Sequence, residues 1–388
     1  MKKLILIAFD AEQTFIMNEL KFYHEHSDEV HCTLYTMRIS DEARRSIENI
    51  DIVMIENEQN LGIRQKVGVL PQLIADVLYA PLYYLKEQNI RYQWNRLASK
   101  QAIAKQIESN VKPSETVLAY WFEEEALCLS YLKKMRADIR AVSRAHAFDL
   151  YEEEQKGGRQ PFRQFMLENV DSILPVSNHG VHYLRNKYPK YASKITLGSL
   201  GIPESDMPLN KAPENPVIVS CGAVSARKRT LEILEVVKRI PNATWVHFGA
   251  GDLFETLKEK CKGLNEINVQ LKGHVPVEAV MEYYKNNPVT AFISLSSSEG
   301  VPVSMMEAIS CGIPVIATNA GGTADLVNES TGLLVDIHYD TNTLLNAIQE
   351  KITHKFKDTT FREGVRAYWE SHYNATRNYK KFIDTIIQ

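Results

Sequence analysis

The sequence predicts an α/β protein with two doubly wound domains, each built on a parallel sheet. Three observations lead to this prediction. The 388 residues are too many for one ordinary core. Short apolar runs alternate with longer amphipathic segments through both halves of the chain, which is typical of parallel sheets covered by helices on both faces. One stretch rich in Gly, Pro and Asn, residues 197–216, interrupts the alternation as a linker would.

The first half contains four short apolar runs that we expect to be buried strands. They cover residues 4–9, 117–121, 141–143 and 172–176. Helices are expected over residues 72–87, with a break at Pro81, and over 162–169. The apolar run at the N-terminus follows two lysines but stops at Asp10, so it is too short for a signal peptide and fits a first strand.

The second half repeats the pattern. Strands are expected over residues 217–220, 243–248, 291–295 and 315–318, and helices over 230–239, 253–261, 277–284 and 304–310. We therefore place one domain at residues 1–200 and the other at 201–369. Aromatic and apolar residues at helical spacing predict one or two terminal helices in the tail, which includes residues 370–388.

Composition excludes several classes of protein. The formal net charge of −3 leaves no basic excess, so we expect no nucleic-acid partner. The five cysteines are odd in number and form no C-x-x-C pair, which favours reduced thiols in the cytoplasm over disulfides or a zinc site. No apolar stretch reaches the about 18 residues that a spanning helix needs.

Residues 61–100 have two interpretations. The run LPQLIADVLYAPLYYLKE is apolar and aromatic, and basic residues flank it: Arg64, Lys66, Lys86, Arg91, Arg96 and Lys100. One interpretation is an interfacial surface that rests on anionic lipid at the inner face of the plasma membrane. The other, which we favour at this stage, is a core helix with solvated basic neighbours.

The segment SSSEGVPVSMMEAISCGIPVIATNAGG, residues 296–322, indicates a ligand site. A strand ends near Leu295, Glu299 follows in a loop, and a helix begins just after Pro302. The first amides of a helix have no intrahelical partner and attract a phosphate. Glu299 and Glu307 would repel a phosphate that they faced, so we expect them to accept hydroxyls of a sugar and a ribose on either side.

A second glycine turn follows at the next strand end. Residues 321–323, Gly-Gly-Thr, are expected to offer another group of backbone amides. Ligands of open α/β sheets bind outside the carboxyl ends of the strands, where both groups of amides would lie.

Glu299 and Glu307, in the context G-V-P-V-S and G-I-P-V-I-A, resemble the Glu-x7-Glu signature of the family 4 retaining glycosyltransferases. The resemblance continues in VIVSCGAVSARKRTLEILEVV, WVHFGAGDL, QLKGHVPVEAVMEYY, SRAHAFDLYEE and ILPVSNHGVHYL, and it covers most of the chain from about residue 140. It implies the GT-B architecture, with two Rossmann-like domains, an active site in the cleft between them, and a terminal helix that packs back on the first domain.

The resemblance also implies residue roles. Glu299 would bind hydroxyls of the donor sugar near the reaction centre, and Glu307 would hold the ribose. Lys228 would neutralise the diphosphate, His146 would orient the donor sugar, and Ser177 would lie near the cleft. Further donor-binding candidates are Gly222, Arg227, Gly300, Val301, Val303, Ser304, Gly249 and Gly273.

Structural roles stay open for several of these residues. Ser177 suits the N-cap of a helix that starts near Asn178. His146 suits a hydrogen-bonded position at a strand end, and Lys228 suits a solvated basic turn. His179, His182, His247 and His274 are given structural interpretations only.

One departure from the family pattern concerns the diphosphate. Members often carry an arginine directly after the glycine of the loop before the lysine, whereas Ala223 follows Gly222 here. The missing charge is assigned to Arg227, Arg229 or Arg144 as alternatives.

The expected activity is retaining transfer of a sugar from a UDP- or GDP-sugar to an acceptor hydroxyl, in synthesis of a surface polysaccharide or a lipid-linked saccharide. No Asp-x-Asp is present, so we expect no metal and no cofactor. The alternatives are a non-catalytic nucleotide-sugar-binding subunit, which Ala223 favours, and a nucleotide-sugar epimerase or a phosphorylase on the same fold. Donor binding without sugar transfer or donor hydrolysis would identify the binding subunit.

Overall fold

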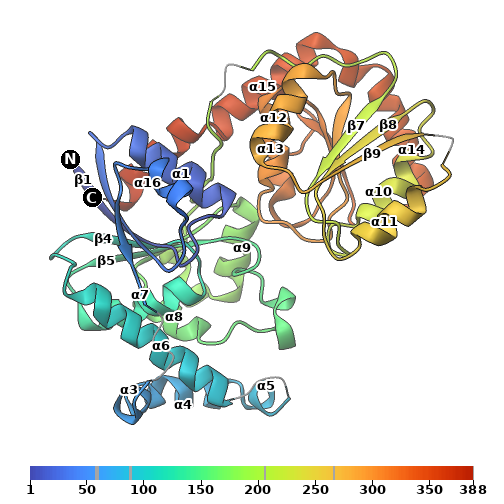
Figure 1. Ribbon diagram of the computed structural model, residues 1–388. Coiled ribbons are helices and arrows are strands. Elements are labelled where there is room, and N and C mark those ends of the chain that lie inside the picture. Colours follow the sequence, from blue (N-terminus) through green and yellow to red (C-terminus); the bar gives the residue numbers. More distant parts are fainter. Residues whose placement is uncertain (57–60, 87–89, 205–206, 265–266, 388) are drawn as a thin grey trace. The chain divides into compact units, whose positions relative to one another are not determined.

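The chain forms two compact units in a computed structural model (Figure 1). The structure describes residues 1–56, 61–86, 90–204, 207–264 and 267–387. Unit 1 comprises Met1–Ser199 and Tyr379–Gln388, and unit 2 comprises Leu200–Asn378. Glu87 at the end of a predicted helix, Ser205 and Asp206 in the predicted linker, and Gln388 lie outside the described residues.

Unit 1 is built on a parallel six-stranded sheet with the order β3-β2-β1-β4-β5-β6. Its strands are β1 (Lys2–Ile7), β2 (Val30–Thr36), β3 (Asp51–Met54), β4 (Thr116–Ala119), β5 (Arg140–Ala145) and β6 (Ser172–Pro175). The four predicted strands are present, and the apolar run at the N-terminus is the central strand β1. The sequence analysis missed β2 and β3.

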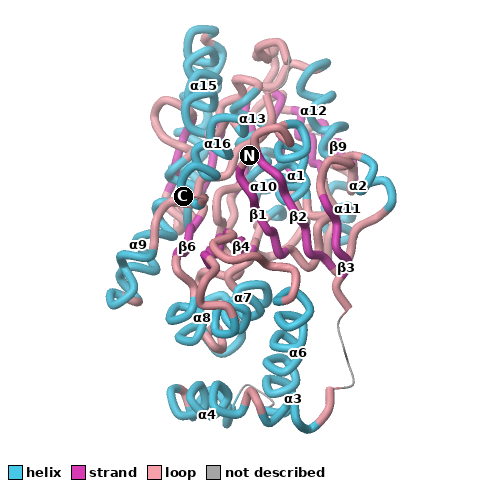
Figure 2. Tube along the Cα trace, turned by 90° about the vertical axis from the view of Figure 1, so that its left-hand side faces the viewer, coloured by secondary structure: helices cyan, strands magenta, loops and turns pink. Residues whose placement is uncertain are grey.

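The helices of unit 1 include two groups. Those near the sheet are α1 (Thr14–Glu25), α2 (Asp41–Arg45), α7 (Glu124–Met135), α8 (Arg163–Asn169), α9 (Asn178–Lys187) and α16 (Ala375–Ile386), whose last turns belong to unit 1. The others are α3 (Ile63–Val67), α4 (Leu70–Tyr79), α5 (Pro81–Lys86) and the long α6 (Ile90–Glu108). Figures 1 and 2 show α3, α4 and α5 beyond α6, on the side away from the sheet.

The predicted break at Pro81 is confirmed, because Ala80, which precedes it, leaves the helical region with φ −139° and ψ 65°. In the part of the chain that the structure describes, no helix has both the length and the apolar character needed to cross a bilayer.

Unit 2 repeats the topology with a parallel sheet in the order β12-β11-β10-β7-β8-β9. Its strands are β7 (Val217–Cys221), β8 (Thr244–Phe248), β9 (Asn268–Gly273), β10 (Ala291–Ser294), β11 (Val315–Thr318) and β12 (Gly332–Val335). Its helices are α10 (Thr230–Val237), α11 (Phe254–Cys261), α12 (Val277–Asn286), α13 (Val303–Ser310), α14 (Thr341–Thr353) and α15 (Thr359–His372).

The sequence analysis missed the strands β9 and β12 of unit 2. Both are edge strands, and most of their residues are only partly buried. Polar residues interrupt the apolar residues of β9, NVQLKG, whereas β12, GLLV, is a short apolar run that the sequence analysis did not single out.

Candidate functional site

Both sheets have the same strand order relative to the chain, which places a topological switch point between their first and fourth strands. In unit 2 this point lies between β7 and β10. The connections of a doubly wound sheet diverge there, and ligands bind in the crevice outside the carboxyl ends of the strands. The loop after β7 carries Lys228, and the loop after β10 carries Glu299.

Lys228 and Glu299 meet across this switch point. The Nζ atom of Lys228 lies 2.5 Å from Oε1 of Glu299. The Glu299 side chain is buried and the Lys228 side chain is half-buried. Gly222, at φ +145°, lies beneath the lysine, because a Cβ built there would have Cε of Lys228 as its nearest neighbour at 3.7 Å. The two principal predicted residues therefore come together in one pair.

Hydrogen bonds hold the two loops against each other. The Ser297 amide donates to the Arg227 carbonyl at 2.9 Å, and Nη1 of Arg227 donates to the Ser298 carbonyl at 3.2 Å. The Thr318 hydroxyl of β11 donates to the Ser296 carbonyl at 2.6 Å. The sequence analysis did not single out these serines or Thr318. Their hydrogen bonds fix the relative positions of the two loops that carry Lys228 and Glu299.

Glycines let the neighbouring strand ends approach closely. A Cβ on Gly249, after β8, would lie 1.9 Å from the Gly222 carbonyl oxygen, so no other residue fits there. The Gly249 amide donates to the Gly273 carbonyl at 2.7 Å. Gly273 has φ +69°. The predicted glycines thus line adjacent ends of β7, β8 and β9, and their role beside a base stays a prediction.

Helix α13 begins at Val303 with Pro302 as its N-cap residue. Val303 and Ser304 occupy its first turn, where backbone amides have no partner inside the helix. Gly300 and Val301 precede it in the loop. The predicted helix start is therefore present, and its role as a phosphate seat stays a prediction.

Glu307 lies in the second turn of α13. Its side chain is buried, and burial raises the pKa of its carboxyl to about 7, with a smaller contribution from the charge of Glu278. Its role in holding the ribose stays a prediction.

The expected second group of free amides is wrong. The Gly322 amide donates to the Glu299 carbonyl at 3.2 Å, and the Thr323 amide donates to the Ala320 carbonyl at 3.1 Å. The segment Gly321–Asp325 is a short 3-10 helix. The Gly322 amide therefore supports the Glu299 loop, and neither it nor the Thr323 amide is free for a phosphate.

Arg144 is wrong as a substitute for the missing arginine. It is fully buried in unit 1, where Nη1 lies 2.7 Å from Oε2 of Glu19. Arg229 donates to the Ile337 carbonyl at 2.8 Å. Arg227 remains exposed beside the Lys228–Glu299 pair, so of the three it has the position that the role requires.

His146 follows β5 in unit 1, within a cluster of aromatic rings. Its ring lies 4.5 Å from Trp121, 5.3 Å from Tyr120 and 5.3 Å from Phe15, centroid to centroid. Neither ring nitrogen has a hydrogen-bond partner among the described residues, although the residue is only 8% exposed. The hydrogen-bonded ring of the structural interpretation is therefore not observed.

Asp149 organises this cluster and was missed in the sequence analysis. It is fully buried and accepts the amides of His146 and Phe122, both at 2.6 Å. The spacing His-Ala-Phe-Asp was the available signal, because an aspartate three residues on can reach back to a strand-end amide.

Ser177 has the structural role that the sequence offered as an alternative. It is the N-cap residue of α9, and its hydroxyl accepts the Gly180 amide at 3.0 Å. His247 is likewise a core residue, and burial lowers its pKa to about 4.

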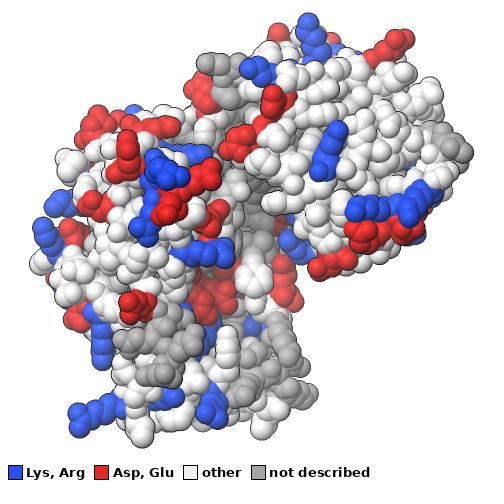
Figure 3. Space-filling view, in the orientation of Figure 1, with Lys and Arg blue, Asp and Glu red and all other residues white. Residues whose placement is uncertain are grey.

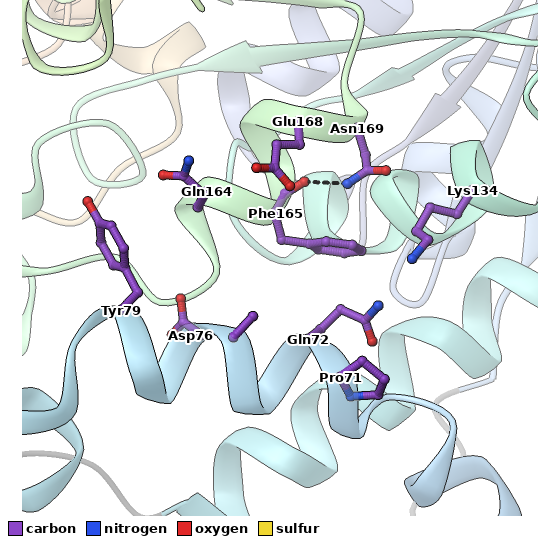
Figure 4. Close-up of a pocket in the computed structure, with 10 residues that line it drawn as sticks. Pro71, Gln72, Asp76, Tyr79, Lys134, Gln164, Phe165, Glu168 and Asn169 are labelled. Atoms are coloured by element: carbon purple, nitrogen blue, oxygen red, sulfur yellow. Dashed lines mark hydrogen bonds between the residues drawn. The ribbon is translucent and has the colours of Figure 1, made fainter. Parts of the chain in front are cut away.

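A separate pocket of about 400 Å³ lies in unit 1 between α4 and α8 (Figure 4). None of the predicted site residues lines it. Among the described residues, no three His, Cys, Asp or Glu side chains gather in a way that would hold a metal ion.

Residues 202–367 match the family model of the glycosyl transferases group 1. Over these residues, which make up most of unit 2, the chain is similar to the domain of that family. It is 27% identical over 178 residues to the sulfoquinovosyl transferase SQD2 of Arabidopsis thaliana, which covers 44% of this chain and 34% of that protein. It is 28% identical over 201 residues to the amylovoran biosynthesis glycosyltransferase AmsK of Erwinia amylovora, with 49% and 47% covered. The chain therefore spans less than half the length of either relative.

The fold agrees with this domain. The structure of the lipopolysaccharide outer core galactosyltransferase WaaB, in its apo form, superposes with a TM-score of 0.72 at 16% identity and covers 99% of both chains. The two six-stranded parallel sheets with flanking helices are the GT-B fold, as the sequence predicts.

Proposed function

We propose that the chain is a metal-independent, retaining glycosyltransferase that moves a sugar from a UDP- or GDP-sugar to an acceptor hydroxyl. The observation that supports this most is the Lys228–Glu299 pair at the switch point of unit 2, beside the first turn of α13. A cation and helix amides suit a diphosphate, and a buried carboxylate suits sugar hydroxyls.

In the proposed reaction the bond between the anomeric carbon and the diphosphate oxygen breaks, and a bond from the acceptor oxygen to that carbon forms. Lys228 and the amides of Val303 and Ser304 stabilise the negative charge that grows on the leaving diphosphate. These contacts strengthen in the transition state, so they speed the reaction and do more than bind substrate. They also supply the charge that a metal ion supplies in other transferases.

Retention requires the acceptor to attack the face from which the diphosphate leaves. The acceptor proton then passes to the departing diphosphate oxygen, and no separate base is needed. This part of the proposal rests on the Glu-x7-Glu resemblance. The acceptor, a growing surface polysaccharide or a lipid-linked saccharide, is proposed from the biosynthetic roles in the names of AmsK and WaaB.

The first experiment is thermal unfolding of the full chain with UDP, GDP and their sugars, in EDTA. A ligand of the native state raises the midpoint by mass action, so a shift with one base identifies the donor class. Release of the nucleoside diphosphate with a saccharide acceptor, still in EDTA, then tests transfer. A shift without turnover would identify a nucleotide-sugar-binding subunit instead, and turnover that requires added Mg²⁺ or Mn²⁺ would contradict metal independence.

A further inference from the structure

The helices α3 to α5 and the start of α6 present an unusually apolar surface to solvent. Of the thirteen exposed large hydrophobic residues in the described chain, nine fall within residues 63–92. We call these nine the apolar surface: Ile63, Val67, Ile74, Leu78, Tyr79, Leu82, Leu85, Ile90 and Tyr92. Leu85 and Ile63 are both 81% exposed. Single exposed hydrophobic side chains are normal, but a gathering of this size marks an interaction site.

The helix α4 at the centre of this surface buries Leu73 and Asp76 on one side and exposes apolar residues on the other. The Asp76 carboxylate accepts the Phe162 amide at 3.1 Å and pairs with the Arg159 guanidinium. Ile74 and Leu78, one turn apart on the same helix, are 53% and 75% exposed. The Asp76 ion pair fixes the rotation of α4, so the outward position of these residues is built into the fold.

The charges around the apolar surface are basic. Arg64 and Arg91 are exposed, and Lys66 is partly exposed. Among the described residues from 61 to 92 the only carboxylate is the buried Asp76. In Figure 3 the coloured atoms at the end of unit 1 formed by α3–α5 are blue and white.

Two of the basic residues counted in the sequence analysis do not belong to this surface. Arg96 lies 2.5 Å from Glu124, Lys100 lies 3.0 Å from the same residue, and both basic residues are 8% exposed. The interpretation of 61–100 as a core helix with solvated basic neighbours therefore holds only in part. Leu73 and Leu97 belong to the core of unit 1, and Arg64 and Arg91 are solvated, as that interpretation expects. It is wrong for the nine exposed apolar residues and for Arg96 and Lys100, which are inside.

We propose that the apolar surface binds an anionic lipid bilayer. Short helices that project aliphatic and tyrosine side chains, with lysine and arginine at their margins, can enter the headgroup region while the cations contact acidic headgroups. This proposal concerns unit 1 alone and does not depend on the proposed sugar transfer.

The charge pattern favours a bilayer over a second copy of the chain. In a two-fold dimer the same patch meets itself, so Arg64 and Lys66 of one copy would approach the same cations of the other. Residues 61–86 and 90–92, which the structure describes, offer them no exposed carboxylate. An acidic lipid surface supplies the complementary charge everywhere.

The test is flotation of the full chain with vesicles of phosphatidylcholine containing about 30% phosphatidylglycerol, at about 0.1 M salt. We expect the chain to bind these vesicles and to bind pure phosphatidylcholine much more weakly. The triple variant Leu78→Ser, Leu82→Ser, Leu85→Ser should lower the partition coefficient at least about tenfold, because three apolar side chains that enter the bilayer are replaced by polar ones. The double variant Arg64→Glu, Lys66→Glu should lower it by a similar factor on the anionic vesicles only.

Matched controls use exposed residues elsewhere in unit 1. Met54→Ser with Leu197→Ser replaces exposed apolar residues outside the surface, and Lys112→Glu with Lys190→Glu reverses charge outside it. Both should bind like the parent chain. Thermal unfolding of every variant checks folding, and an exposed leucine should leave the midpoint unchanged.

Three results would overturn the proposal. The first is no binding to the anionic vesicles. The second is equal binding by the parent and the leucine variant. The third is a parent that runs as a dimer by light scattering and ignores vesicles, while the leucine variant runs as a monomer, because the surface would then be an interface between copies.

Discussion

Each unit contains a cation paired with a glutamate near the carboxyl ends of its strands, and the two pairs differ in access to solvent. Arg144 on β5 and Glu19 on α1 are both 0% exposed, and the guanidinium also lies 4.0 Å from the Phe382 ring. Lys228 and Glu299 are 21% and 8% exposed. Two ion pairs of the same chemical type, on sheets of the same topology, therefore differ in their exposure to solvent.

The difference shows which pair can take part in binding. A buried pair is held by neighbours on every side, and removal of one member leaves an uncompensated charge in a medium of low dielectric. Water weakens the attraction between a partly exposed lysine and its carboxylate. Such a lysine at a switch point can therefore exchange the carboxylate for a phosphate at a low cost in free energy. We assign the first pair to stability and the second to the donor.

The largest expected effect is on the buried pair. Arg144→Ala should lower the free energy of unfolding by about 3–5 kcal/mol, because Glu19 loses its partner while it stays buried. Urea denaturation measures this, and Lys112→Ala, an exposed change in the same unit, should have almost no effect. Where Arg144→Ala does not fold, Arg144→Lys keeps the charge. In either variant the nucleotide affinity of the folded fraction should be unchanged, and a selective loss of affinity would return Arg144 to the donor site.

The next effect concerns the exposed pair. Lys228→Ala should lower the transfer rate by about two to three orders of magnitude, as removal of one preorganised electrostatic contact does. Its unfolding free energy should fall by less than that of Arg144→Ala, because Lys228 is partly exposed, although Glu299 loses its partner while it stays buried. Lys258→Ala, an exposed lysine on α11, is the control. A rate near that of the parent would move the diphosphate role to Arg227.

The predictability of the two units from sequence differs for a physical reason. In unit 2, glycine and proline mark the strand ends, and Glu299, Lys228 and Gly222 could be placed on loops because each follows a continuous apolar strand. Their pairing could not be predicted, since it depends on which strands are neighbours. The Gly322 amide was misassigned for the same reason: its acceptor, the Glu299 carbonyl, comes from another loop.

In unit 1 the missing information is burial. Arg144 and Arg64 are the same residue type, and no local pattern distinguishes a guanidinium sealed against Glu19 from one exposed on α3. The helix α4 shows the same limit. Its hydrophobic periodicity identifies an amphipathic helix but not the face that is buried, and the ion pair of Asp76 with Arg159 settles that.

A third effect tests the buried carboxyl of unit 2. Burial raises the pKa of Glu307 from 4.5 to about 7, so the folded state binds a proton that the unfolded state has lost between these pH values. Stability from this group is present below about pH 4.5 and is lost as pH rises through 7. Glu307→Gln should therefore gain up to about 3 kcal/mol relative to the parent between pH 4.5 and pH 8.

The measurement is urea unfolding of parent and variant across this pH range. The variant should still lose some stability with rising pH, because burial also raises the pKa of Glu125 to about 8 in unit 1. Parallel curves for parent and variant would show that Glu307 titrates normally. Glu307→Ala should also weaken nucleotide binding, and an unchanged affinity would contradict the ribose role.

The smallest expected effect is that of a substitution at His146, which tests whether this histidine has a structural role or takes part in sugar transfer. Its two ring nitrogens have no hydrogen-bond partner among the described residues, and Tyr120 stacks on it at an interplanar angle of 16°. His146→Phe keeps an aromatic ring and removes the cost of two buried ring nitrogens without hydrogen bonds. It also removes the contact of Nδ1 with the buried Asp149 carboxylate at 3.8 Å, so the unfolding free energy should change by less than about 1 kcal/mol. If the imidazole orients the donor sugar, the transfer rate should nevertheless fall by about ten- to a hundredfold. A structural histidine would give a variant that is as active as the parent, and the aromatic cluster of unit 1 would then be core, with no part in transfer.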